Sequence, residues 1–178
     1  NNQSVGGLTL SSNGSAATAN VGNYTITASN ATSSGNFSTS NYNISYVNGS
    51  LAITQANITV TANDQARTYG GTNPTTGVVT LTAGTLYNGN TLGNATVASI
   101  ANATSNVGNY TLTASNQTLS NGSVGNYNIT YNNGTLTVNP ANLTITANSA
   151  STQYGLGTNL TSVGYVATGL VNNQSVGG

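Results

Sequence analysis

Apolar and polar residues alternate with a period of two at several places along the 178-residue chain. From Ile58 to Ala62 every second residue is apolar and the residues between are threonines, and the segment from Leu143 to Ala147 has the same pattern. Such alternation predicts half-buried β-strands with one apolar and one polar face. The pattern predicts further strands with inward-facing apolar side chains at residues 24–28, 42–46, 110–114 and 127–131.

Two Asn-Gly dipeptides follow predicted strands, Asn48-Gly49 and Asn133-Gly134. Asn-Gly tolerates the positive φ angles of a tight hairpin, so each dipeptide is expected to join two paired strands. No segment shows helical periodicity with caps, and the prevalent residues Asn, Thr, Ser and Gly are poor helix formers.

The chain repeats itself. Residues 21–30 and 107–116 are identical at nine of ten positions with an offset of 86, and residues 41–70 and 126–155 are identical at 16 of 30 positions with an offset of 85. The heptapeptide NNQSVGG occurs at both ends, at residues 1–7 and 172–178. Fixed self-similarity of this kind is the signature of a repeat protein.

These offsets predict three segments of a tandem array. Residues 56–140 form one complete repeat unit, residues 1–55 form the C-terminal part of a unit, and residues 141–178 form the N-terminal part of the next, with 172–178 repeating 1–7. The weaker similarity between residues 86–94 and 170–178 supports this register. A sheet with one apolar face needs a second layer, so we expect all-β units of about 85 residues with a β-sandwich or β-grasp-like fold. Short connections between the units favour an extended fibre.

The composition limits the chemistry. The chain holds one acidic residue, Asp64, and one basic residue, Arg67, with no His, Cys, Met or Trp. Acid/base pairs, activated nucleophiles and transition-metal sites cannot be assembled from this set, so no enzymatic activity, catalytic residue, metal site or cofactor is expected. One Arg cannot neutralise a phosphate backbone, and no apolar run approaches the roughly 18 residues of a membrane span. Nucleic acid and a membrane span are therefore not expected.

A family resemblance is carried by several spaced elements. The stretch NYNITYNNGTLTVNPANLTITAN at residues 126–148, the Tyr154-Gly155 pair and the upstream VGNYTLTASN at residues 107–116 resemble the MBG-type repeat domains, and more loosely the YDG-type ones, of large bacterial surface adhesins and haemagglutinin-like proteins. The resemblance implies an extracellular stalk or adhesive module and supplies no catalytic or ligand-binding residues. The chain departs from the family in its loss of charged residues around the Tyr-Gly pair.

Asn-x-Ser/Thr occurs 18 times, and this motif accepts glycans in secreted proteins. An alternating strand built from Asn, Thr and apolar residues produces the same motif without any glycan. The loop positions are the better glycosylation candidates: Asn30, Asn94, Asn102 and Asn116.

Two other features have structural explanations as well as functional ones. Thr-x-Thr pairs resemble an ice-binding array, but their uneven spacing favours ordinary outward-facing strand threonines. Asp64 and Arg67 lie three residues apart and are expected to form at most an exposed ion pair worth up to about 1 kcal/mol.

The main hypothesis is a structural or adhesive repeat module of a giant extracellular protein or filament at the bacterial cell surface. Its expected partners are neighbouring repeats, joined head to tail, and a host or matrix surface. One alternative is a carbohydrate- or ice-binding β module. Another is a self-assembling fibre subunit completed by strands of a neighbouring chain, because strand edges here lack the Lys and Pro that normally guard them.

Overall fold

A computed structural model describes residues 3–177 and shows an all-β chain with three short 3₁₀ turns. The chain divides into two compact units. Unit 1 comprises Asn1–Val60, Leu81–Gly93 and Gln117–Thr130, and unit 2 comprises Thr61–Thr80, Asn94–Asn116 and Tyr131–Gly178.

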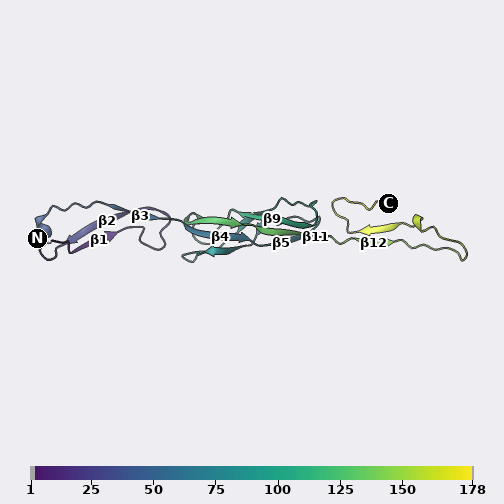
Figure 1. Cartoon of the computed structure of the whole chain (residues 1–178), viewed down its shortest axis with the longest axis horizontal. Coiled ribbons are helices and arrows are strands. Elements are labelled where there is room, and N and C mark those ends of the chain that lie inside the picture. Colours follow the sequence, from purple (N-terminus) through teal and green to yellow (C-terminus); the bar gives the residue numbers. More distant parts are fainter. Residues whose placement is uncertain (1–2, 178) are drawn as a thin grey trace. The chain divides into compact units, whose positions relative to one another are not determined.

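Unit 1 begins with a three-stranded antiparallel sheet in the order β1-β2-β3 (Figure 1). Its strands are β1 (Gly7–Ser11), β2 (Gly22–Thr32) and β3 (Gly49–Ile53). Residues alternate between intermediate and exposed along most of β2, as the period of two predicts. The 3₁₀ turn η1 (Thr39–Asn41) lies between β2 and β3.

A second sheet places β4 (Ala56–Ala62) between β10 (Tyr127–Asn132) and β7 (Val79–Gly84). Each of these three strands has residues in both units. The apolar positions of β4 are buried, with Ile58 at 2% and Val60 at 0% exposure. The strand and its inward face, predicted from the alternation, are both confirmed here.

Unit 2 holds a five-stranded sheet in the order β5-β11-β9-β8-β6. The β5–β11 pair is parallel and the others are antiparallel. Leu112 on β9 and Leu136 on β11 are completely buried. The strands are β5 (Gln65–Thr68), β6 (Thr76–Gly77), β8 (Ala95–Ala98), β9 (Gly108–Ser115) and β11 (Gly134–Asn139).

The remainder of unit 2 contains a two-stranded antiparallel sheet of β12 (Thr144–Ala147) and β13 (Tyr165–Thr168), with η3 (Leu160–Ser162) between them. The strand was predicted, but its inward face is not buried: Leu143 is 46% and Ile145 is 54% exposed. Their counterparts in β4, Ile58 and Val60, are covered. The difference arises because β12 has only β13 beside it among residues 3–177.

The predicted hairpin at Asn133-Gly134 is wrong. β10 and β11 flank this dipeptide but belong to different sheets, and neither Asn133 nor Gly134 has a positive φ. Gly134 is needed for another reason, because a Cβ there would collide with the carbonyl oxygen of Ala62. Asn48-Gly49 also has no positive φ and leads into β3, which pairs with β2.

The strand predicted at residues 42–46 is also absent, and the segment has no regular structure. Tyr42 is 50% and Tyr46 is 42% exposed. The equivalent segment in the second repeat is β10, which is held as a strand by pairing with β4. A polar-apolar alternation therefore becomes a strand here only where a partner strand supplies the ladder.

Candidate functional site

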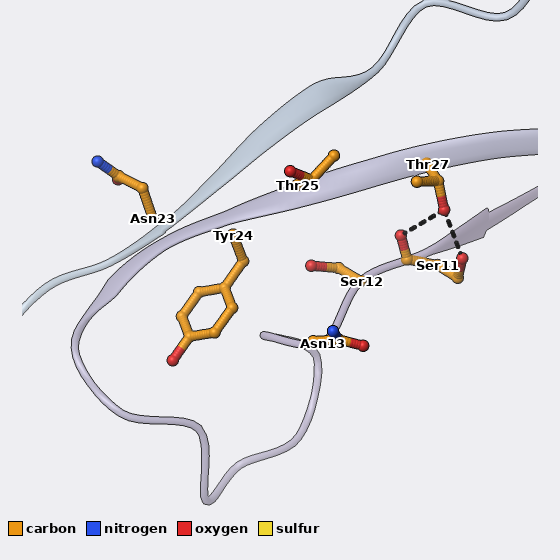
Figure 2. A pocket seen from close by; sticks show the side chains of 7 residues that line it. All are labelled: Ser11, Ser12, Asn13, Asn23, Tyr24, Thr25 and Thr27. Atoms are coloured by element: carbon orange, nitrogen blue, oxygen red, sulfur yellow. Dashed lines mark hydrogen bonds between the residues drawn. The ribbon is translucent and has the colours of Figure 1, made fainter.

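A hollow of about 350 Å³ lies beside β1 and β2 in unit 1 (Figure 2). Tyr24 supplies the only aromatic ring among its lining residues, and none of these residues is charged. The lining residues are Ser11, Ser12, Asn13, Asn23, Tyr24, Thr25 and Thr27.

Several polar groups of this hollow are already used by the fold. The hydroxyls of Ser11 and Thr27 form a hydrogen bond of 2.7 Å, which Figure 2 marks with a dashed line. The hydroxyl of Tyr24 donates to the carbonyl oxygen of Asn20 at 2.8 Å. A Cβ at Gly14 would lie 2.6 Å from the Tyr24 ring, so a glycine is required beneath it.

The same tyrosine arrangement occurs in the second repeat. There the hydroxyl of Tyr110 donates to the carbonyl oxygen of Asn106, also at 2.8 Å. Because both bonds join a side chain to backbone four residues earlier, they hold the loop before the strand. The hollow offers hydroxyl and amide hydrogen bonds and one ring face, without a group suited to proton transfer near neutral pH.

Arg67 is the most unusual polar residue of unit 2. It lies on β5 with only 8% of its surface exposed. Its Nε donates to Oδ1 of Asn73 at 2.7 Å, and its guanidinium also donates to the carbonyl oxygens of Thr68, at 3.3 Å, and Asn102. The guanidinium therefore fastens the loop that contains Asn102 to the end of β5.

The expected exposed ion pair between Asp64 and Arg67 is not what the structure shows. Oδ1 of Asp64 accepts the backbone N–H of Thr135 at 2.7 Å. Arg67 points to the buried side of β5, whereas Asp64 precedes the strand and is exposed. The two charges bind different partners.

All four glycosylation candidates are exposed. Asn30 and Asn116 occupy equivalent positions and have positive φ angles of 56° and 51°. Asn116 follows β9, but Asn30 lies within β2 and not in a loop as predicted. Asn94 immediately precedes β8, and Oδ1 of Asn102 accepts the N–H of Thr104 at 3.0 Å. Their role as glycan acceptors stays a prediction.

The sequence pattern does not reveal the polar groups that organise the loops. Asn73 binds Arg67 and donates to the carbonyl oxygen of Ala101, and Asn88 and Asn172 donate to backbone far along the sequence. The similarity of residues 86–94 and 170–178 was a usable signal for the last two. No such signal marks Asn73 among 31 asparagines.

No group of three or more His, Cys, Asp or Glu side chains gathers within residues 3–177. No helix in that range is long and apolar enough to cross a membrane.

Comparison with known proteins identifies one family. The MBG domain (YGX type) family matches residues 1–52 and again residues 58–137. No curated protein and no solved structure matches the chain. The family is a non-catalytic repeat family with a β-rich domain. Because the matched residues cover well over half of its length, the chain belongs to the MBG domain (YGX type) family.

Proposed function

We propose that this chain is a structural or adhesive repeat module of a large extracellular bacterial surface protein or filament. The observation that carries the proposal is the tandem occurrence of two family matches, with only residues 53–57 between them. A non-catalytic domain repeated at such short spacing suits a spacer that is lengthened by adding copies. Its partners are then neighbouring repeats, joined head to tail, and a host or matrix surface at the far end.

The side chains support a mechanical rather than a chemical role. Tyr24 and Tyr110 use their hydroxyls to hold backbone, and Arg67 is buried among carbonyl and amide oxygens. With a single Asp and a single Arg in the sequence, the surface offers little to charged ligands.

Cell labelling tests the location. Antibodies raised against the 178-residue chain should label intact, unpermeabilised cells of the source organism, and protease treatment of those cells should remove the signal. Labelling that appears only after permeabilisation contradicts an extracellular role.

The hollow beside Tyr24 favours a second candidate function, carbohydrate binding. Hydroxyls, amides and one aromatic ring are groups that bind sugars without charge, and the hollow brings them together. A glycan array probed with the full chain tests this candidate. Selective binding that an Asn13→Ala variant loses would favour a lectin-like module over a spacer.

A further inference from the structure

Two turns of the same kind occur 84 residues apart. In residues 87–90 the N–H of Asn90 donates to the carbonyl oxygen of Tyr87 at 3.0 Å, and the two central residues, Asn88 and Gly89, have φ angles of 56° and 71°. Positive φ at both central positions is the mark of a type I′ turn, which Asn and Gly tolerate best.

The second turn, at residues 171–174, repeats this geometry. The N–H of Gln174 donates to the carbonyl oxygen of Val171 at 3.1 Å, and Asn172 and Asn173 have φ angles of 55° and 56°. The two turns differ in sequence, Tyr-Asn-Gly-Asn against Val-Asn-Asn-Gln, but share the asparagine at the first left-handed position.

That shared asparagine makes the same long-range hydrogen bond in both cases. Nδ2 of Asn88 donates to the carbonyl oxygen of Ala17 at 3.0 Å within unit 1, and Nδ2 of Asn172 donates to the carbonyl oxygen of Ala103 at 2.9 Å within unit 2. Ala17 and Ala103 are equivalent at the repeat offset of 86. In the predicted register, each bond joins the turn of one repeat to the repeat before it.

The acceptor carbonyl is held in place by its own repeat. The carbonyl oxygen of Ala103 also accepts the backbone N–H of Gly70 at 3.2 Å. The preceding carbonyl, of Asn102, accepts from the guanidinium of Arg67 and from the N–H of Ser105. The loop is therefore preorganised to accept a donor from outside its repeat.

The Tyr69-Gly70 pair forms the rest of this contact. The hydroxyl of Tyr69 accepts from Nε2 of Gln174 at 3.2 Å. Gly70 has a φ of 86°, and a Cβ there would lie 2.7 Å from Cβ of Val171. The glycine is thus required both by its backbone conformation and by the close approach of the turn.

The equivalent pair, Tyr154-Gly155, has the same backbone but an open surface. Gly155 has a φ of 84° and nothing within 4 Å of its Cβ position, and Tyr154 is fully exposed. We propose that the Tyr-Gly pair and the neighbouring alanine carbonyl of each repeat form a docking seat for the left-handed Asn turn of the next repeat. Tyr69-Gly70 is the occupied seat, and Tyr154-Gly155 is the seat for the turn of a further repeat.

This proposal rests on the proposed function only in taking the repeats as consecutive, and it does not depend on where the protein is found. A negative cell-labelling result would not contradict the docking seat. Absence of the contact between the turn and the Tyr-Gly pair in solution would contradict the docking seat but not the proposed extracellular location.

The first experiment compares Asn172→Gly with Asn173→Gly in the full chain. Glycine tolerates positive φ, so both variants keep the turn, but only Asn172→Gly removes the amide donor. Asn173→Gly is the matched control, because it reproduces the Asn88-Gly89 sequence of the first turn.

The readout is the nuclear Overhauser contact between the Val171 methyls and the Gly70 Hα. We expect the contact in the wild type and in Asn173→Gly, and its loss in Asn172→Gly while the β12–β13 contacts of Ile145 with Ala167 persist. No contact in the wild type, or an unchanged contact in Asn172→Gly, overturns the proposal. Tyr69→Phe gives an independent check, since it should weaken the contact without altering the turn.

The second experiment fills the open seat. Residues 172–178 repeat residues 1–7, so Gly178 can be followed in register by a second copy of residues 8–93, which supplies the next Asn88 turn. We expect the Gly155 amide signal to shift and the Tyr154 ring to become less accessible to solvent. A nuclear Overhauser contact should also appear between Gly155 and the added Tyr87. Unchanged Tyr154 and Gly155 signals in the extended chain contradict an open seat.

Discussion

At the level of single residues, polar side chains hold the backbone in place. Tyr24 and Tyr110 donate to the carbonyl oxygens of Asn20 and Asn106, and Asp64 accepts the N–H of Thr135. The recurrence of the tyrosine bond at the repeat offset shows that the repeats conserve contacts as well as sequence. Arg67, the one basic residue, acts in the same way, since all its hydrogen bonds go to uncharged oxygens.

Arg67→Met should destabilise the fold by about 2–3 kcal/mol. Methionine keeps the apolar stem but removes the donor that satisfies Oδ1 of Asn73 and one of the two donors to the carbonyl oxygen of Asn102, and a part-buried acceptor left without a donor is costly. Urea unfolding followed through the amide signals of β5 and β11 measures the change. Asp64→Asn is the control for loss of one charge and should cost below about 1 kcal/mol, because the amide oxygen still accepts the N–H of Thr135. Equal losses in both variants would show that Arg67 acts through net charge alone.

Gly49 and Gly134, from the two Asn-Gly dipeptides predicted to form hairpins, differ in how much space surrounds them. Gly134→Ala should cost about 1–3 kcal/mol, because its Cβ would collide with the Ala62 carbonyl in a packed region. Gly49→Ala should cost below about 1 kcal/mol, since its nearest neighbour is Cβ of Ile26 at 3.6 Å, an ordinary contact. Unfolding midpoints of the two variants check this, and similar values would contradict the role given to Gly134.

At the level of elements, alternation predicted where strands can form but not which strands pair. The same alternation predicts strands at residues 57–62 and 142–147, and both segments contain one. Residues 42–46 were predicted with equal reason and have no strand, because strand formation depends on a partner that local sequence does not reveal. Asn133-Gly134 likewise predicts a turn from its local sequence. Gly134 is instead needed because the backbone of Ala62, distant in sequence, lies close to it.

Equivalent apolar residues should therefore differ in their contribution to stability. Ile58→Ala should cost about 2–5 kcal/mol, since Ile58 is 2% exposed and its removal leaves a cavity. Leu143→Ala should cost below about 1 kcal/mol, because Leu143 is 46% exposed. Urea unfolding of both variants provides the comparison, and a large loss for Leu143→Ala would mean that β12 is covered in solution.

At the level of the whole molecule, most of the exposed large apolar residues lie in the two predicted partial repeats, while the predicted complete repeat also exposes Val78, Tyr87, Ile100, Val107 and Val124. Ile145 and Tyr42 are 54% and 50% exposed, whereas their counterparts in the predicted complete repeat, Val60 and Tyr127, are 0% and 5% exposed. The sequence predicted the repeat and its length, and the positions that would be buried in a complete unit. It could not show which residues would pack over the exposed apolar positions of the partial repeats, because that depends on what lies beside each partial repeat.

The predicted partial repeats should complete each other between copies of the chain. In the predicted complete repeat, residues 56–140, Nδ2 of Asn128 donates to Oδ1 of Asn57 at 2.9 Å, and the equivalent residues in the predicted partial repeats are Asn43 and Asn142. Pairing of residues 141–178 of one copy with residues 1–55 of another would bring Asn142 beside Asn43 and bury Ile145. The chain has no native cysteine, so Asn43→Cys and Asn142→Cys variants report this pairing alone.

Mixed under oxidising conditions, the Asn43→Cys and Asn142→Cys chains should form a disulfide-linked heterodimer in preference to either homodimer. The double variant Asn57→Cys/Asn128→Cys is the internal standard, because its two positions are hydrogen-bonded within one chain and should form an intramolecular disulfide. Replacing Asn43→Cys by Asn116→Cys in the mixture should abolish the preference, since Asn116 lies outside the equivalent of this strand pair. A statistical mixture of dimers with the first pair would mean that each partial repeat folds without its complement, and the exposed faces of β12 and of residues 42–46 would then be surfaces that the isolated chain tolerates in water.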